Sequence, residues 1–264
     1  MRANTVKEQW RRGEVTYGGW LSIASTVSAE IMAHRGYDWL CIDMQHGVID
    51  YQAAAPMLQV IGATDTVPFV RVPWNEFGII GKMLDAGAMG VIIPMVNSPD
   101  EAQRAVSACR YFPAGARSYG PTRIGITAGA DYFARANDEI ACIPMIETKQ
   151  AVDQLDDILA VPGIDAVYVG PSDLSITFGQ QPRGDNEGAF EQARLRIAAG
   201  CREHGVVAGI HANAGLAARH RNAGYQMITI SSDVLSLGAG AHADLKVARE
   251  GARADDAPAQ GRTY

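Results

Sequence analysis

The most constraining feature of this sequence is the alternation of short apolar runs with segments of helical periodicity. Eight such runs occur, at residues 16–23, 39–43, 67–71, 90–95, 140–147, 165–169, 206–210 and 226–230. Apolar runs of this length are typical of strands buried on both faces. Parallel strands need crossover helices, and eight strand and helix units close most simply into a barrel. We therefore expect an α/β protein with the (β/α)8 TIM-barrel fold.

The length of the chain fits one domain. It has 264 residues, and α/β barrels commonly form single domains of about 200–250 residues. No linker or internal repeat marks a second domain, so we expect one barrel over residues 1–250, with its last helix at residues 234–249. Residues 251–264 are rich in Ala, Gly, Asp and Arg and are expected to form a flexible C-terminal tail.

Charge, hydropathy and cysteine spacing argue against several classes of protein. Lys and Arg number 23 against 29 Asp and Glu, which gives a net charge of −6, and the absence of a basic run interleaved with aromatics argues against a nucleic-acid partner. No apolar signal core opens the sequence and no eighteen apolar residues run together, so no membrane segment is expected. A cytoplasmic location is predicted. The cysteines show neither zinc nor disulfide spacing; they are Cys41, Cys109, Cys142 and Cys201.

Polar residues stand where several of the predicted strands end. Asp43 and then His46 follow the second strand, Arg71 ends the third, Glu147 ends the fifth, and Asp173 comes shortly after the sixth. Functional groups of such barrels lie at the carboxyl ends of the strands. These side chains are therefore expected to meet at the barrel mouth.

Two of these acids are candidate metal ligands. Glu147 and Asp173 follow adjacent strands, and two carboxylates without neighbouring histidine or cysteine form a hard oxygen site that suits Mg²⁺ or Mn²⁺. The alternative for each acid alone is that it caps the helix that follows it. Convergence of both acids at one mouth favours the metal site.

The groups around the acids could bind an anionic substrate. Residues 170–173 open a helix, and their backbone N–H groups could hold a carboxylate. The alternative is an ordinary turn. The guanidinium of Arg71 could neutralise negative charge that develops on a substrate oxygen. Its alternative role is a structural ion pair.

Asp85 and the segment 111–129 are further candidates. Asp85 lies near the end of a predicted helix, where the helix dipole disfavours its charge. We predict that it pairs with His46 and holds the imidazole in one tautomer; the alternative is a solvated carboxylate. Segment 111–129 is too long for an ordinary connector and is expected to be a functional loop over the site.

Lysine placement argues against one class of mechanism. Schiff-base chemistry needs a desolvated lysine at the reacting centre, and none of the four lysines ends a predicted strand; they are Lys7, Lys82, Lys149 and Lys246. A carbanion would therefore have to be stabilised by metal and arginine. No glycine-rich phosphate loop follows any strand, so a nucleotide site is also disfavoured.

Six motifs together resemble the HpcH/HpaI aldolases, which are metal-dependent class II pyruvate aldolases of the phosphoenolpyruvate/pyruvate barrel superfamily. The likeness extends over about residues 18–245. The motifs are Asp43-Met44-Gln45-His46-Gly47, Val70-Arg71-Val72-Pro73, Leu84-Asp85-Ala86-Gly87, residues 111–118, Ile146-Glu147-Thr148 and Val169-Gly170-Pro171-Ser172-Asp173-Leu174.

The resemblance implies a division of roles within the site. Glu147 and Asp173 would bind a divalent metal ion, Mg²⁺, Mn²⁺ or Co²⁺, which also chelates pyruvate or a related 2-oxo acid. Arg71 would stabilise the enolate oxygen, and His46 with Asp85 would transfer protons. Substrate contacts would come from Arg71 and from Gly170, Pro171, Ser172 and Asp173, with the last two amides holding the carboxylate. The resemblance also implies a trimer of dimers in which the C-terminal helix is exchanged between subunits.

Three residues next to the site are expected to act indirectly. Asp43 would position the loop that carries His46, or a metal-bound water. Gln45 stands where the family often has an acid, and the change removes a charge that could orient Arg71. Met145 stands where the family often has a glutamine, and the change removes a polar contact near the metal.

The sequence thus predicts an aldehyde-lyase that reversibly cleaves 4-hydroxy-2-oxo acids to pyruvate, or a substituted pyruvate, and an aldehyde. One alternative is an oxaloacetate-type decarboxylase or an acyl-CoA lyase on the same scaffold. Another is a non-catalytic metabolite-binding barrel. The preference for the aldehyde is expected to depend on segment 111–129 and on a neighbouring subunit, including its residues 131–133.

Overall fold

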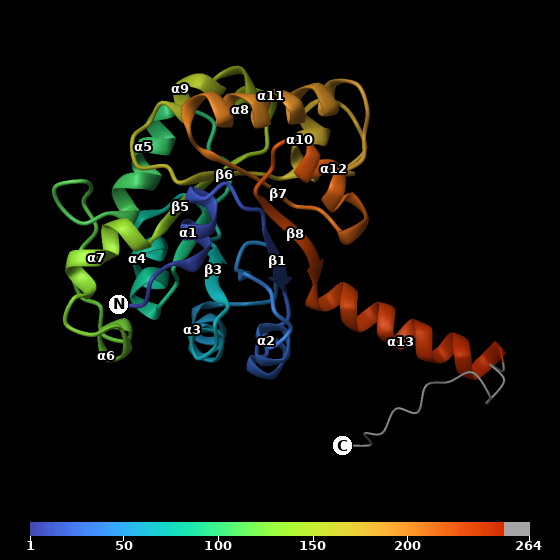
Figure 1. Cartoon of the computed structure of the whole chain (residues 1–264), viewed down its shortest axis with the longest axis horizontal. Helices are drawn as coiled ribbons and strands as arrows, with labels where there is room; N and C mark the ends of the chain where they lie inside the picture. The colour runs from blue at the N-terminus through green and yellow to red at the C-terminus, as the bar shows by residue number, and fades with distance from the viewer. Residues whose placement is uncertain (251–264) are drawn as a thin grey trace.

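The computed structural model describes residues 1–250 and forms a closed barrel of parallel strands in the order β1 to β8 (Figure 1). This confirms the predicted TIM barrel. The predicted C-terminal tail, residues 251–264, lies outside the described residues. The strands are β1 (Thr16–Leu21), β2 (Trp39–Asp43), β3 (Val67–Arg71), β4 (Gly90–Ile93), β5 (Ala141–Ile146), β6 (Ala166–Val169), β7 (Val207–Ile210) and β8 (Met227–Ser232).

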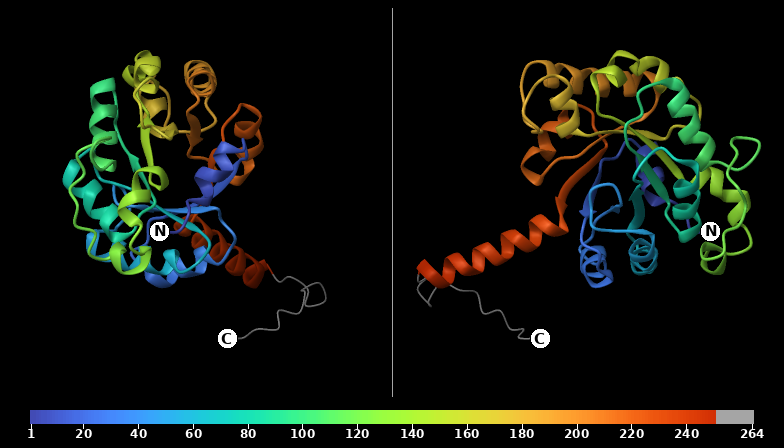
Figure 2. Two further views of the ribbon diagram at one scale, coloured as in Figure 1. Left: turned by 60° about the vertical axis from the view of Figure 1, so that its left-hand side comes forward. Right: turned by 180° about the vertical axis from the view of Figure 1, so that it is seen from behind.

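Helices surround the barrel in the alternation that the sequence predicts (Figures 1 and 2). They are α1 (Thr5–Arg11), α2 (Thr26–Ala33), α3 (Tyr51–Gly62), α4 (Phe77–Ala86), α5 (Pro99–Cys109), α6 (Ile124–Ala128), α7 (Tyr132–Glu139), α8 (Lys149–Asp153), α9 (Leu155–Leu159), α10 (Pro171–Thr177), α11 (Ala189–His204), the 3-10 turn η1 (Ala214–Leu216), α12 (Ala217–Asn222) and α13 (Asp233–Glu250). No described helix is both long and apolar enough to cross a membrane.

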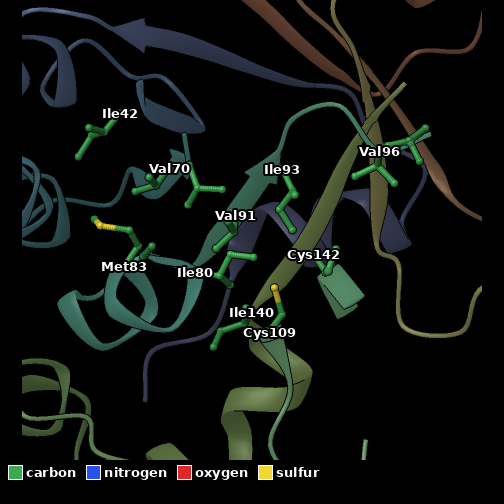
Figure 3. Packing of buried hydrophobic residues seen from close by; sticks show 14 of the residues in the cluster. Ile42, Val70, Ile80, Met83, Val91, Ile93, Val96, Cys109, Ile140 and Cys142 are labelled. Carbon is green, nitrogen blue, oxygen red and sulfur yellow. The ribbon is translucent and has the colours of Figure 1, made fainter. Parts of the chain in front are cut away.

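The core has two layers because alternate strand residues point to opposite faces. Outward residues such as Ile42, Val70 and Val91 pack against the helices, including Ile80 and Met83 of α4 (Figure 3). Inward residues fill the barrel: they include Trp39 and Phe69, whose rings stack at 5.7 Å. The barrel interior is therefore filled by side chains, and its functional groups are expected at the mouth.

Helix α1 was not expected, because the elements predicted from the sequence begin only at residue 16. Asn4 caps this helix by accepting a hydrogen bond from the amide of Lys7. Lys7 is buried, pairs with Asp165 at 2.7 Å and donates to the carbonyl of Ile140 at 3.2 Å. Both partners precede a strand, so α1 lies against the amino ends of the strands. This contact closes the end of the barrel opposite the mouth.

Segment 111–129 does not lie over the mouth of its own barrel, contrary to the prediction for a single chain. It follows α5, which runs antiparallel to the strands and therefore ends near their amino ends. Part of the segment is helical, as α6. Crossover topology places every connection from a helix to the next strand at the end of the barrel away from the site.

The last helix, α13, projects away from the barrel (Figures 1 and 2). Of its 18 residues only Asp233 is buried. Asp233 accepts hydrogen bonds from the amides of Ser22 and Ile23, which ties the start of the helix to β1. The large apolar side chains exposed along the helix are Val234, Leu235, Leu237, Leu245 and Val247. Exchange of this helix between subunits stays a prediction.

Candidate functional site

The predicted strand-end residues other than Asp43 line a cavity of about 160 Å³ in the barrel mouth. Its lining is His46, Arg71, Met145, Glu147, Tyr168, Gly170, Pro171, Ser172, Asp173 and His211. A larger open hollow of about 930 Å³ lies at the other end of the barrel, around Arg2, His34 and Asp38. None of the predicted site residues lines that hollow. The chemistry therefore points to the smaller cavity.

Glu147 is fixed from two sides at the end of β5. The residue is 2% exposed. Its Oε1 accepts a hydrogen bond of 2.7 Å from the amide of Met95, which adopts the left-handed region with φ of 54°, a conformation that is uncommon outside glycine. Its Oε2 faces Gly170 so closely that an added Cβ there would overlap it. This positions the carboxylate toward the cavity.

The charge of Glu147 is destabilised where it lies. Burial, together with the negative charge of Asp173, raises the pKa of Glu147 to about 7, although the Met95 amide and Arg71 oppose the rise. Asp173 lies in the first turn of α10 and is exposed. A cation bound by both carboxylates would relieve this repulsion.

The donor set fits a hard divalent cation. Glu147 and Asp173 offer carboxylate oxygens, the ligands that Mg²⁺ and Mn²⁺ prefer. Within residues 1–250 no group of three or more His, Cys, Asp or Glu residues could hold a metal ion. Two protein ligands alone would leave most coordination positions to water and substrate oxygens.

Arg71 is held by a bidentate ion pair with Asp43, its register partner on β2. The Nε donates to Oδ1 at 2.9 Å and Nη2 to Oδ2 at 2.6 Å, and the guanidinium lies 5.0 Å from the centroid of the Trp20 ring. Burial raises the pKa of Asp43, but the hydrogen bonds and charge of Arg71 outweigh it and hold the pKa below its usual value. The guanidinium thus reaches the cavity wall in one orientation.

The same carboxylate orders the loop that carries His46. Oδ1 of Asp43 accepts hydrogen bonds from the amides of Gln45 at 3.1 Å and His46 at 3.3 Å. Gly47 lies against the carbonyl oxygen of Asp43, where a Cβ would not fit. The imidazole of His46 stands exposed at the rim of the cavity.

The two departures from the family pattern have different surroundings. Arg71 is oriented by Asp43, so it does not depend on an acid at Gln45. The buried Oε1 of Gln45 has no hydrogen-bond partner among residues 1–250. Met145 is 1% exposed and lines the cavity beside Glu147 and Gly170. It makes that wall apolar.

The predicted pairing of His46 with Asp85 is wrong within one chain. Asp85 lies near the carboxyl end of α4, a helix that begins near the mouth and extends about 13 Å toward the other end of the barrel. There its carboxylate accepts a 2.7 Å hydrogen bond from Arg117, whose side chain is 1% exposed. Any contact of Asp85 with His46 would require a second subunit.

Three residues of the site were not predicted from the sequence. His211 directly follows β7 and lines the cavity, as does Tyr168 of β6. Trp20 of β1 donates to Oδ2 of Asp43 at 3.0 Å and stacks on Tyr168 at 5.6 Å. His211 carried the same signal as Arg71, a polar residue at a strand end. Trp20 and Tyr168 lie inside apolar runs and carried none.

The sequence of this chain is similar to those of known aldolases. Residues 16–239 match the family model described as HpcH/HpaI aldolase/citrate lyase. A hydroxypyruvate/pyruvate aldolase from Rhizorhabdus wittichii is 39% identical over 93% of this chain and 99% of its own length. A 4-hydroxy-2-oxo-heptane-1,7-dioate aldolase from Salmonella dublin is 37% identical over 91% of this chain and 92% of its own.

A solved structure extends the agreement to three dimensions. The crystal structure of an HpcH/HpaI aldolase/citrate lyase family protein from Burkholderia cenocepacia superposes with a TM-score of 0.87 and 36% sequence identity. The match covers 94% of this chain and 100% of that one.

Proposed function

Because the chain belongs to the HpcH/HpaI aldolase/citrate lyase family and is an aldolase of that family, we propose that it reversibly cleaves 4-hydroxy-2-oxo acids. The products are pyruvate, or a substituted pyruvate, and an aldehyde. The observation that carries the proposal is one small cavity in which Arg71 faces the carboxylates Glu147 and Asp173.

A divalent metal is part of the proposal, in keeping with the class II chemistry of the family. Glu147 and Asp173 would hold Mg²⁺, Mn²⁺ or Co²⁺. When bound, such an ion supplies Lewis-acid polarisation of the 2-oxo group.

The remaining residues bind the substrate and move its proton. The amides of Ser172 and Asp173 at the start of α10 hold the carboxylate, and Gly170 and Pro171 shape that wall. Arg71 binds the oxygen on C2, where negative charge develops as the bond between C3 and C4 breaks. His46 at the rim accepts the proton of the C4 hydroxyl, and the electron pair of the broken bond becomes the enolate. Protonation of the enolate at C3 then gives the 2-oxo acid.

The size of the cavity favours a small oxo acid over a coenzyme A ester. Sites for larger organic ligands commonly measure about 300–1,000 Å³, whereas this cavity is about 160 Å³. A three- or four-carbon 2-oxo acid fits that space. The aldehyde part of the aldol would extend past His46 toward solvent.

A homo-oligomer completes the proposal. An isolated helix of this kind is marginally stable in water, yet α13 exposes Leu235, Leu237 and Leu245 and rests on its own barrel only at its start. Exchange of α13 between two subunits in a trimer of dimers would bury these side chains. A neighbouring subunit would also be the only source of an Asp85 that could reach His46.

The test is product release from a panel of 4-hydroxy-2-oxo acids, measured with a coupled assay for pyruvate. Metal-loaded protein should be active, chelator-treated protein inactive, and activity should return on adding Mg²⁺ or Mn²⁺. Oxaloacetate in the same assay tests the decarboxylase alternative. The variant Glu147→Gln should lose metal binding in calorimetry, whereas Lys149→Gln on the outer surface should not. Full activity after complete metal removal would contradict the proposal.

A further inference from the structure

His211 occupies the wall of the cavity in a fixed orientation. Its backbone amide donates to the carbonyl of Val169 at 3.1 Å, which anchors the residue to β6. Its ring meets the Trp20 ring edge-on at 5.0 Å and 89°, and Arg71 lies over the same indole. The imidazole therefore lies beside the guanidinium, at a greater depth than His46.

The hydrogen bonds behind the ring favour one tautomer of the imidazole. Nδ1 lies 3.4 Å from the hydroxyl of Tyr168, which also bonds to the hydroxyl of Thr229. Thr229 is 1% exposed, and Tyr168 is its only side-chain partner in residues 1–250. If Thr229 donates to Tyr168 and Tyr168 donates to Nδ1, every buried hydroxyl hydrogen is used. The ring proton then resides on Nε2.

The ring is uncharged near neutral pH. Burial, followed by the positive charge of Arg71, lowers the pKa of His211 to about 4. A neutral imidazole can donate from Nε2 without opposing the guanidinium, and at that pKa it is not a general acid at neutral pH. Nε2 has no hydrogen-bond partner among the described residues, so it is available to a ligand in the cavity.

Other polar groups of the cavity already bind two parts of the substrate. In the proposed function, on which this inference rests, the carboxylate lies at residues 172–173 and the C2 oxygen at Arg71. His46 at the rim serves C4. The position left for the deeper His211, beside Arg71, is the substituent on C3.

We propose that His211 binds a hydroxyl group on C3 of the 2-oxo acid by donating a hydrogen bond from Nε2. The enzyme would therefore favour a hydroxylated three-carbon 2-oxo acid over its unsubstituted analogue as the nucleophilic partner. A site built to bond a substrate hydroxyl discriminates strongly against the analogue that lacks it, because the buried polar group is left unpaired.

The experiment compares hydroxypyruvate with pyruvate in aldol addition to one aldehyde, glycolaldehyde, using the metal-loaded full chain. The variant His211→Phe keeps an aromatic edge on Trp20 but removes the donor, and His211→Gln keeps an N–H group. For His211→Phe, kcat/KM with hydroxypyruvate should fall about 10- to 100-fold, the loss expected when a buried hydroxyl loses its partner. With pyruvate it should change less than about threefold, and His211→Gln should restore part of the preference.

The outcomes separate this inference from its premise. Equal losses for both oxo acids would assign His211 to positioning Trp20 and Arg71, and no loss for either would make it a passive wall; both results overturn the inference. His211→Leu provides a second variant without the donor if His211→Phe does not fold. Wild-type protein that turns over neither oxo acid would contradict the proposed function itself.

Discussion

Replacing Asp43 with asparagine tests the residue that orients both Arg71 and the loop that carries His46. The substitution keeps the size of the side chain but removes the charge opposite a guanidinium that is 11% exposed, in a pair whose other member is 3% exposed. Breaking a buried ion pair from one side typically costs about 3–5 kcal/mol. Because Arg71 retains a cavity-facing edge, we expect the low end, about 3 kcal/mol.

That loss is measurable in two ways. For a chain of this size, about 3 kcal/mol corresponds to a fall in Tm of roughly 6–12 °C. We also expect kcat/KM for aldol cleavage to fall about 100-fold, since a misplaced donor to a developing oxyanion commonly costs that much. Urea unfolding at fixed protein concentration gives the stability term, and initial rates give the catalytic term.

A double-mutant cycle tests the physical reason. Arg71→Gln removes the other partner, and the double variant should be less destabilised than the sum of the single variants by about 2 kcal/mol. The exposed pair of Arg12 and Glu14, 2.7 Å apart, provides the matched control, and Glu14→Gln should leave the unfolding midpoint nearly unchanged. Additivity within about 0.5 kcal/mol at Asp43 and Arg71 would refute the coupling.

Two further predictions concern a close backbone approach and a buried imidazole. Gly170→Ala places a Cβ against Oε2 of Glu147. We expect weaker Mg²⁺ binding in calorimetry with little change in Tm. The control is Gly184→Ala, where the added Cβ meets only ordinary contacts, and this variant should bind Mg²⁺ normally. Unchanged metal affinity in Gly170→Ala would contradict the geometry. Burial, and to a smaller extent the positive charge of Arg194, lowers the pKa of His220 from 6.5 to about 4. Between these pH values the unfolded chain binds more protons than the folded chain. The free energy of unfolding should therefore fall by roughly 3 kcal/mol as the pH drops from 6.5 to 4. His220→Leu should reduce the fall of Tm between pH 6.5 and 4, because it removes one destabilising group while His211, which acts in the same direction, and Glu147, which acts in the opposite direction, remain. Exposed His34→Leu should keep the full slope, and an unreduced slope in His220→Leu would oppose the assignment.

The two predictions that the structure contradicts were wrong for the same physical reason. Asp85 and segment 111–129 were judged by their local sequence, a carboxylate at a helix end and an unusually long connector. Asp85 lies near the end of α4, and segment 111–129 follows α5. Both helices run antiparallel to the strands, so the fold places these residues at the end of the barrel away from the mouth. Local sequence showed that Asp85 needed a partner, and only the structure identified that partner as Arg117.

The sequence by itself determined the barrel and the acids, the arginine and the helix start at its mouth. Strand-length apolar runs separated by helical segments admit few closed arrangements, and a polar residue directly after such a run can only lie at the mouth. Only the tertiary structure decided how these groups act on one another. The pairing of Asp43 with Arg71, the repulsion that raises the pKa of Glu147, and the placement of His211 beside Trp20 all depend on strand register and distances between elements. Those quantities arise from packing across the barrel, which no local pattern encodes.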